Sequence, residues 1–132
     1  SLMLKFLIIM TNRVNCVETA KRIYMQLFWS VSHSVVGSWG ISQTKAIEYE
    51  NKETLALEVN GFIHKGWVYI SYNLGADTYE VRLLNKDLEV IKFVDEAYCD
   101  NIGEIIDRLV ECDNPKEYKK KIREMYSLVN LE

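Results

Sequence analysis

Hydrophobic residues in the first part of the chain recur every three or four positions, as on one side of an amphipathic helix. The pattern runs from Asn15 to about Ser32, with polar residues on the opposite side. Asn15 followed by Glu18 fits a capping box, in which two side chains bond the free backbone N–H groups of a helix start. Two glycines in the segment VVGSWG end the pattern. We therefore predict a helix over residues 15–32.

The middle of the chain changes to an alternation of period two, which is typical of half-buried strands. β-Branched and aromatic residues dominate it, and short polar segments interrupt it. No connection reaches the roughly dozen residues that a parallel crossover needs, so the strands are expected to be antiparallel. We predict five of them, at residues 41–49, 54–60, 62–72, 77–84 and 88–94.

Towards the end of the chain the helical period returns. An apolar stripe over residues 102–110 follows Asn101, which forms a second capping box with Glu104. A further helix is expected to begin at Asn114, because Pro115 suits the first position of a helix.

The order of these elements gives the fold class. We predict one α+β domain over residues 1–132, with an N-terminal helix, a five-stranded antiparallel meander and two C-terminal helices packed on the sheet. A length of 132 residues with 48% hydrophobic residues and one proline fits a single globular domain. Ser1 and Leu2 before Met3 look like a cloning scar and Met10 offers another start, so residues 1–9 are candidates for a tag or a non-native start.

The segment between residues 58 and 84 offers two hairpin turns, and they place His64 differently. If Asn60-Gly61 forms a two-residue turn, Leu57 faces His64 and the imidazole lies on the apolar side. If residues 63–66 form a four-residue loop, the imidazole lies in solvent. Asn-Gly is the stronger turn signal and is favoured, although Gly66 suits the loop; both alternatives remain open at this level.

The next hairpin predicts a sheet with two different sides. A four-residue loop at 73–76 pairs apolar residues on one side, namely Ile70 with Tyr79 and Val68 with Val81. The other side pairs Trp67 with Arg82 and Tyr69 with Glu80. Trp67 and Arg82 are then close enough for a cation–π contact. Glu80 and Arg82 are interpreted as the solvated side of a half-buried strand.

Charge and cysteine content narrow the class of function. The formal net charge of −3 gives no overall attraction to nucleic acid or to an anionic membrane. The three cysteines, Cys16, Cys99 and Cys112, form no CxxC motif and no cluster with histidine, which argues against a disulfide framework or a metal site. We interpret them as small buried residues of a cytoplasmic protein.

The apolar N-terminus is too short and too irregular for a targeting segment. The apolar run from Phe6 to Met10 is short, because Lys5 stands directly before it. No small-residue cleavage site follows it. A membrane span needs about 20 apolar residues. We predict neither a signal peptide nor a membrane association.

Catalytic chemistry has weak support in the sequence. His33 is placed at a helix end, and His64 has no serine nucleophile in a Gly-x-Ser-x-Gly motif beside it. The segment DTYEVR resembles a metal-binding strand of restriction-like nucleases over six residues, with Asp77 and Glu80. However, Arg82 stands where a lysine is usual, and the two carboxylates are not separated onto adjacent strands.

The glycines and one basic run are two further features that bear on ligand binding. The six glycines form neither a P-loop nor a GxGxxG element, so no nucleotide cofactor is predicted. The basic run KKKIR could meet phosphate groups through Lys119, Lys120 and Arg123. An acidic segment precedes it, and pairs within the helix also neutralise it.

The function favoured by these patterns is protein binding without catalysis. We predict a small accessory protein that binds a protein partner, or itself as a homodimer, through a sheet face containing Trp67, Tyr69, Glu80 and Arg82. No metal and no cofactor are expected. One alternative is a nucleic-acid-associated protein that uses the basic C-terminal helix. Another is a small hydrolase that uses His64 with Glu58 or Asp77.

Overall fold

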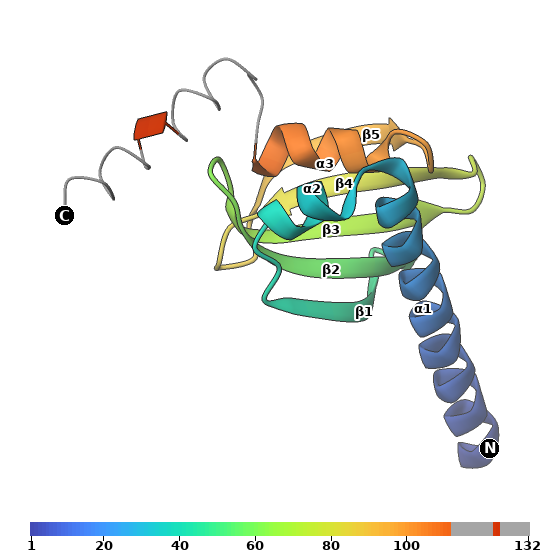
Figure 1. Ribbon diagram of the computed structural model, residues 1–132. Coiled ribbons are helices and arrows are strands. Elements are labelled where there is room, and N and C mark those ends of the chain that lie inside the picture. Colours follow the sequence, from blue (N-terminus) through green and yellow to red (C-terminus); the bar gives the residue numbers. More distant parts are fainter. Residues whose placement is uncertain (112–122, 125–132) are drawn as a thin grey trace.

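The structure, a computed structural model, describes residues 1–111 and 123–124, apart from the side chain of Asn12. Three helices and five strands follow one another along this part of the chain (Figure 1). Their bounds are α1 Leu2–Ser30, α2 His33–Ser38, β1 Gln43–Tyr49, β2 Lys52–Asn60, β3 Lys65–Asn73, β4 Thr78–Leu84, β5 Val90–Ala97 and α3 Ile102–Val110.

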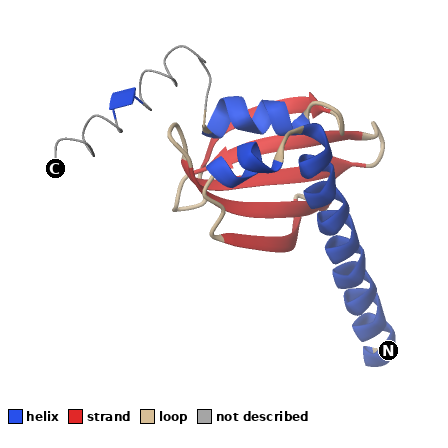
Figure 2. Cartoon of the chain, in the orientation of Figure 1, coloured by secondary structure: helices blue, strands red, loops and turns tan. Residues whose placement is uncertain are grey.

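The elements form two layers. The strands make one antiparallel sheet in the order β1-β2-β3-β4-β5, and all three helices lie against the same side of it (Figures 1 and 2). This arrangement confirms the α+β class and the five-stranded meander. Of the two predicted C-terminal helices, α3 is present, and the one expected from Asn114 lies outside the described residues.

The core fills the space between the helices and the sheet. Strands β2, β3 and β4 present alternate apolar residues to the helices, because successive side chains point to opposite sides of a strand. Ile23 and Leu27 of α1 meet Ile102 and Ile106 of α3 there, and all four are fully buried. Trp39, just after α2, is also fully buried and donates from Nε1 to Asp107 Oδ1 at 2.9 Å.

The capping boxes predicted at Asn15 and Asn101 are wrong. Helix α1 begins at Leu2 rather than near Asn15, with Ser1 Oγ accepting from the Leu4 N–H. No glycine or proline interrupts the chain before Asn15, so the helix continues through the expected start. At α3 the Asn101 side chain makes no cap bond to the helix and instead accepts from the Tyr98 N–H.

Neither of the two alternatives for the β2–β3 hairpin is correct. Asn60 pairs with Lys65, which leaves a four-residue loop at residues 61–64. The C-terminal end of α3 explains this loop, because Val110 O accepts from both the Ile63 and the His64 backbone N–H. Last-turn carbonyls of a helix lack partners within the helix. The loop therefore supplies hydrogen-bond donors to the C-terminal end of α3. These bonds favour the four-residue loop over the two-residue Asn-Gly turn.

Replacing Gly61 by alanine is expected to lower the free energy of unfolding by about 2 kcal/mol. A Cβ at this position would lie directly against Val110 O and 2.5 Å from Val110 Cγ1, so the loop would have to leave the end of α3. Gly75→Ala is the matched control, since its nearest neighbour atom would lie 3.6 Å away. Urea unfolding followed by circular dichroism measures both; equal midpoints would contradict this role of Gly61.

The β3–β4 hairpin has the predicted sides but a different register. Asn73 pairs with Thr78, so the loop covers residues 74–77 and the pairing is shifted by two residues from the prediction. Tyr69 therefore pairs with Arg82, and Trp67 pairs with Leu84. A shift of two keeps every side chain on its side of the sheet. The predicted apolar and mixed sides are consequently correct, whereas the predicted cross-strand pairs are wrong.

Candidate functional site

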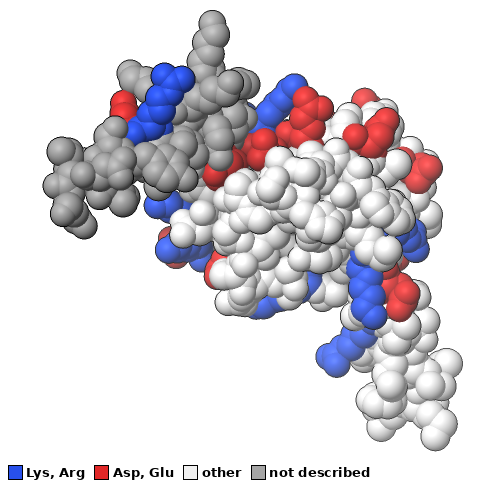
Figure 3. All heavy atoms as spheres, in the orientation of Figure 1, with Lys and Arg blue, Asp and Glu red and all other residues white. Residues whose placement is uncertain are grey.

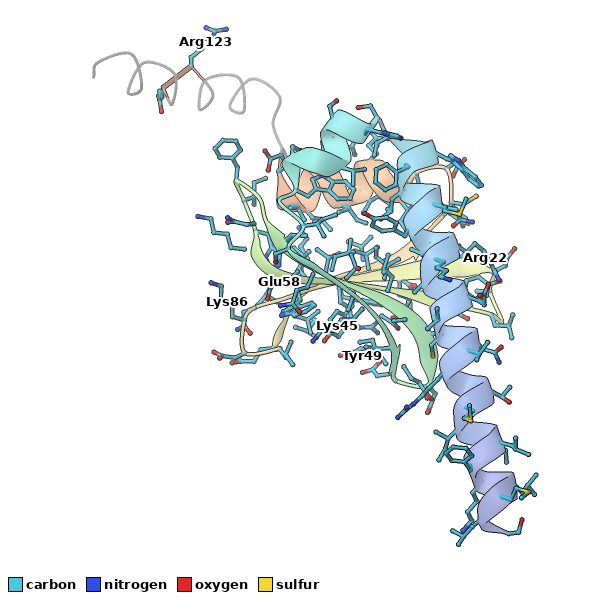
Figure 4. The ribbon with its side chains drawn as sticks, turned by 60° about the horizontal axis from the view of Figure 1, so that its bottom comes forward. Arg22, Lys45, Tyr49, Glu58, Lys86 and Arg123 are labelled. Carbon is cyan, nitrogen blue, oxygen red and sulfur yellow. The ribbon has the colours of Figure 1, made fainter. Side chains whose placement is uncertain are left out.

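The candidate site is the side of the sheet that faces away from the helices, which we call the open face. Lys45, Tyr49 and Glu58 project from it, away from α2 and α3 (Figure 4). Its apolar centre is a cluster separate from the main core: Ala56, Tyr69 and Leu84 are buried, and Ile47, Tyr49 and Trp67 pack around them. In the described part of the chain, no helix covers this cluster.

Arg82 is the structural centre of the open face. Its guanidinium carbon lies 4.6 Å from the ring centroid of Phe93 on β5 and 5.1 Å from that of Tyr49 on β1. Arg82 belongs to β4, so rings from both edge strands meet at a side chain of an inner strand. Cation–π attraction to the two rings restrains the guanidinium and both rings in turn.

Three ion pairs complete the surroundings of Arg82. Its Nη1 donates to Glu80 Oε2 and its Nη2 to Glu50 Oε2, each at 3.2 Å, and Lys52 Nζ lies 3.5 Å from the same Glu80 oxygen. Glu80 and Arg82 are only 7% and 9% exposed. Their interpretation as a solvated strand side was therefore wrong. The aromatic rings of the edge strands and these ion pairs shield them from water.

Trp67 has a different cation than predicted. Lys45 Nζ lies 5.2 Å from the Trp67 ring centroid, so the cation–π partner comes from β1 and not from Arg82. Trp67 also meets Tyr69 edge to face at a centroid distance of 6.3 Å. Burial, and more weakly the neighbouring Tyr49, raises the pKa of Tyr69, so its hydroxyl stays protonated at neutral pH.

The four predicted site residues thus form one continuous surface, but they lie at different depths in it. Tyr69, Glu80 and Arg82 are buried, whereas Trp67 is half-buried. The outermost side chains of the face include Phe93, 48% exposed, and Lys45. Sequence reasoning missed Lys45, Tyr49 and Phe93. Their positions in the alternation of the two edge strands could have placed them on this side.

The histidine of the hydrolase alternative has a structural role. His64 is 5% exposed, and its Nε2 donates to Trp67 O at 3.0 Å. Asp77 follows the far end of β3 from His64 and accepts from the Tyr72 hydroxyl. Glu58 accepts from Ser42 Oγ. The structure does not bring His64 and Asp77 together, since the nine residues of β3 separate them.

The described cysteines, Cys16 and Cys99, are both free thiols. Cys16 is a buried free thiol, and burial, Glu53 and Glu48 all raise its pKa, which lowers the fraction of nucleophilic thiolate. Cys99 is free and exposed, so its interpretation as a buried residue was wrong, and Cys112 lies outside the described residues. Within residues 1–111 and 123–124, no three His, Cys, Asp or Glu side chains group as a metal site requires.

The basic segment of the nucleic-acid alternative is mostly outside the described residues. Lys119 and Lys120 belong to that part, and of the three candidates only Arg123 is described, as an exposed residue. Charged side chains elsewhere are of both signs: in the view of Figure 3 acidic groups gather along the top of the domain, and most basic groups lie lower down. No described helix combines the length and the apolarity needed to cross a membrane.

Comparison of the chain with protein-family models, with curated proteins and with solved structures gave no match. The geometry of the open face is therefore the basis for a function.

Proposed function

We propose that this chain is a non-enzymatic, cytoplasmic binding protein whose open face takes up a protein partner. The observation that carries the proposal is the arrangement of half-exposed aromatic rings around fixed cations. Tyr49 and Phe93 are held by Arg82, and Trp67 is held by Lys45. Aromatic and arginine side chains at the centre of a patch are the residues that most often dominate protein interfaces.

The fixed geometry supports binding in a second way. A partner that docks on mobile side chains loses about 0.5–1.5 kcal/mol for each one it immobilises. On the open face this ordering has already occurred during folding, because Arg82 donates hydrogen bonds to Glu80 and Glu50 and lies 4.6 Å and 5.1 Å from two ring centroids. Arg82, Glu80 and Tyr69 therefore act as a support. Trp67, Phe93 and Lys45 are the side chains that a partner would contact.

The partner expected for this surface carries apolar or aromatic side chains together with an acidic group. Rings of Trp67 and Phe93 would pack against the apolar part, and the exposed ammonium of Lys45 would pair with a carboxylate. Free thiols at Cys16 and Cys99 suit the reducing cytoplasm in which such a complex would form.

Removing the outer rings tests the proposal. In quantitative co-purification from cells that express the protein, Trp67→Ala/Phe93→Ala should reduce recovery of a specific partner about tenfold, as loss of more than 1 kcal/mol predicts. Tyr98→Ala is the matched control, because Tyr98 is 46% exposed and follows β5, outside the aromatic cluster. A photo-crosslinking residue at position 45 should label the same partner. Recovery that is unchanged in the double variant, or equally reduced by Tyr98→Ala, would contradict the proposal.

A further inference from the structure

The N-terminal half of α1 projects beyond the sheet as an apolar rod (Figure 1). From Leu2 to Val14 it extends about 20 Å, given a rise of about 1.5 Å per residue. Large hydrophobic side chains on it are between 48% and 86% exposed: Leu2, Met3, Leu4, Phe6, Leu7, Ile8, Ile9, Met10 and Val14. The projecting end is uncharged on the side seen in Figure 3. A surface of this kind marks a site of association.

One line of these residues has the spacing of a coiled coil. Exposed apolar side chains recur at alternating steps of four and three, namely Met3, Leu7, Met10, Val14 and Val17. This is the a/d repeat of a heptad, which keeps one seam of a helix against a second helix. The seam covers only about two heptads, too few for a stable coiled coil without other contacts.

A groove continues the seam into the folded domain. It lies between α1 and the edge strand β1 and has a volume of about 330 Å³. Its lining residues are Val17, Ala20, Lys21, Tyr24 and Met25 of α1 with Thr44, Lys45, Ala46 and Leu55 of the sheet. Val17 belongs to both the seam and the groove. The lining residues are mostly apolar, so the groove suits an apolar helix.

We propose that α1 holds together two copies of this chain, with the projecting half of each helix packed antiparallel along the seam and into the groove of the other. Val14 then faces the second copy's Val14 at the twofold axis, and Met3, eleven residues earlier, reaches the second copy's Met25, eleven residues later. The same chain thus carries an apolar rod and the groove that receives it, as an isologous dimer interface requires.

The exposed surface is large enough for such a dimer. A half-exposed side chain of this size offers on the order of 80 Å² of apolar surface. The seam, its flanking residues and the groove walls together reach roughly 800 Å² per copy, which is the size of a standard specific interface. This inference does not rest on the proposed function, because α1 and the aromatic cluster of the open face lie on opposite sides of the sheet; Lys45 of the edge strand β1 borders both surfaces.

A charge placed on the seam tests the dimer. By sedimentation equilibrium the wild-type chain should have twice its monomer mass, and Met10→Glu should weaken dimerisation on the order of 100-fold, because the antiparallel order places position 10 opposite the second copy's Glu18 and a buried carboxylate there has no cationic partner. Ile8→Glu is the matched control: Ile8 is 53% exposed against 48% for Met10, but it lies off the seam. It should leave the dimer intact, as should Trp67→Ala/Phe93→Ala.

Disulfide cross-linking tests the antiparallel order. In a background with Cys99 and Cys112 replaced by serine, Val14→Cys should give an interchain disulfide, whereas Met3→Cys should not, since the two Met3 positions lie far apart. Cross-linking at both positions would indicate parallel helices and overturn the arrangement. A monomeric wild-type chain would overturn the dimer itself, as would binding of the monomer to phosphatidylglycerol vesicles, which would assign the rod to a lipid surface.

Discussion

Trp39→Ala is expected to lower the free energy of unfolding by about 4 kcal/mol, the largest effect of any single substitution considered for this chain. Trp39 is fully buried beside α3, where it fills the core and supplies the hydrogen bond to Asp107 Oδ1. The substitution leaves a cavity and leaves Asp107 Oδ1 without this donor, and both lower the free energy of unfolding. Urea unfolding followed by far-ultraviolet circular dichroism measures the change without relying on tryptophan fluorescence.

The chain offers its own control for this substitution. Trp29, in the last turn of α1, is 75% exposed, so Trp29→Ala removes the same side chain from solvent instead of from the core. It should change the free energy of unfolding by less than about 0.5 kcal/mol. Similar losses in the two variants would show that Trp39 does not hold α2 and α3 together as the structure indicates.

Arg82→Ala is the second substitution with a large expected effect, a loss of about 3 kcal/mol in the free energy of unfolding. The alanine would leave the buried carboxylate of Glu80 with Lys52, 3.5 Å away, as its remaining cationic partner, and would remove the cation–π contacts to Tyr49 and Phe93. Uncompensated buried charge is costly because the protein interior solvates it poorly. Arg82→Lys should recover only part of the loss, since an ammonium lacks the guanidinium fork that reaches Glu80 and Glu50 from two different nitrogens.

Arg108→Ala is the matched control for Arg82→Ala. Arg108 pairs with Glu104 one helical turn away in α3, and its side chain is 66% exposed. Exposed pairs of this kind contribute at most about 1 kcal/mol, so the variant should unfold close to the wild-type midpoint. The double substitution Glu80→Met/Arg82→Met should be more stable than Arg82→Ala, because no charge is left buried alone. A double variant as unstable as Arg82→Ala would contradict the ion-pair explanation.

The expected instability of Arg82→Ala changes how the open face should be tested. A variant that unfolds also loses its partners, so Arg82 cannot report on binding. Trp67 and Phe93 are better probes, because they lie further out on the same face and take no part in its ion pairs.

The alternation of apolar and polar residues determined much of this fold by itself. It predicted the α+β class, the five strands in meander order and the α3 helix, and it assigned Val68, Ile70 and Val81 to the core side of the sheet. These predictions hold because side-chain direction follows from local backbone geometry, with a period of 2 in strands and 3.6 in helices. Even the wrong β3–β4 register left them intact, because it was wrong by two residues.

Contacts between distant segments decided the rest. The loop at residues 61–64 replaced the Asn60-Gly61 turn because the carbonyl of Val110, far away in sequence, needed hydrogen-bond donors. Arg82 and Glu80 became buried because Tyr49 and Phe93, from the two edge strands, close over them. A local pattern predicts which side of a strand a side chain points to. Whether that side chain is buried depends on which distant segments pack against it in the folded chain. For that reason the sequence identified the mixed side of the sheet, and only the tertiary structure separated its supporting residues from its outer ones.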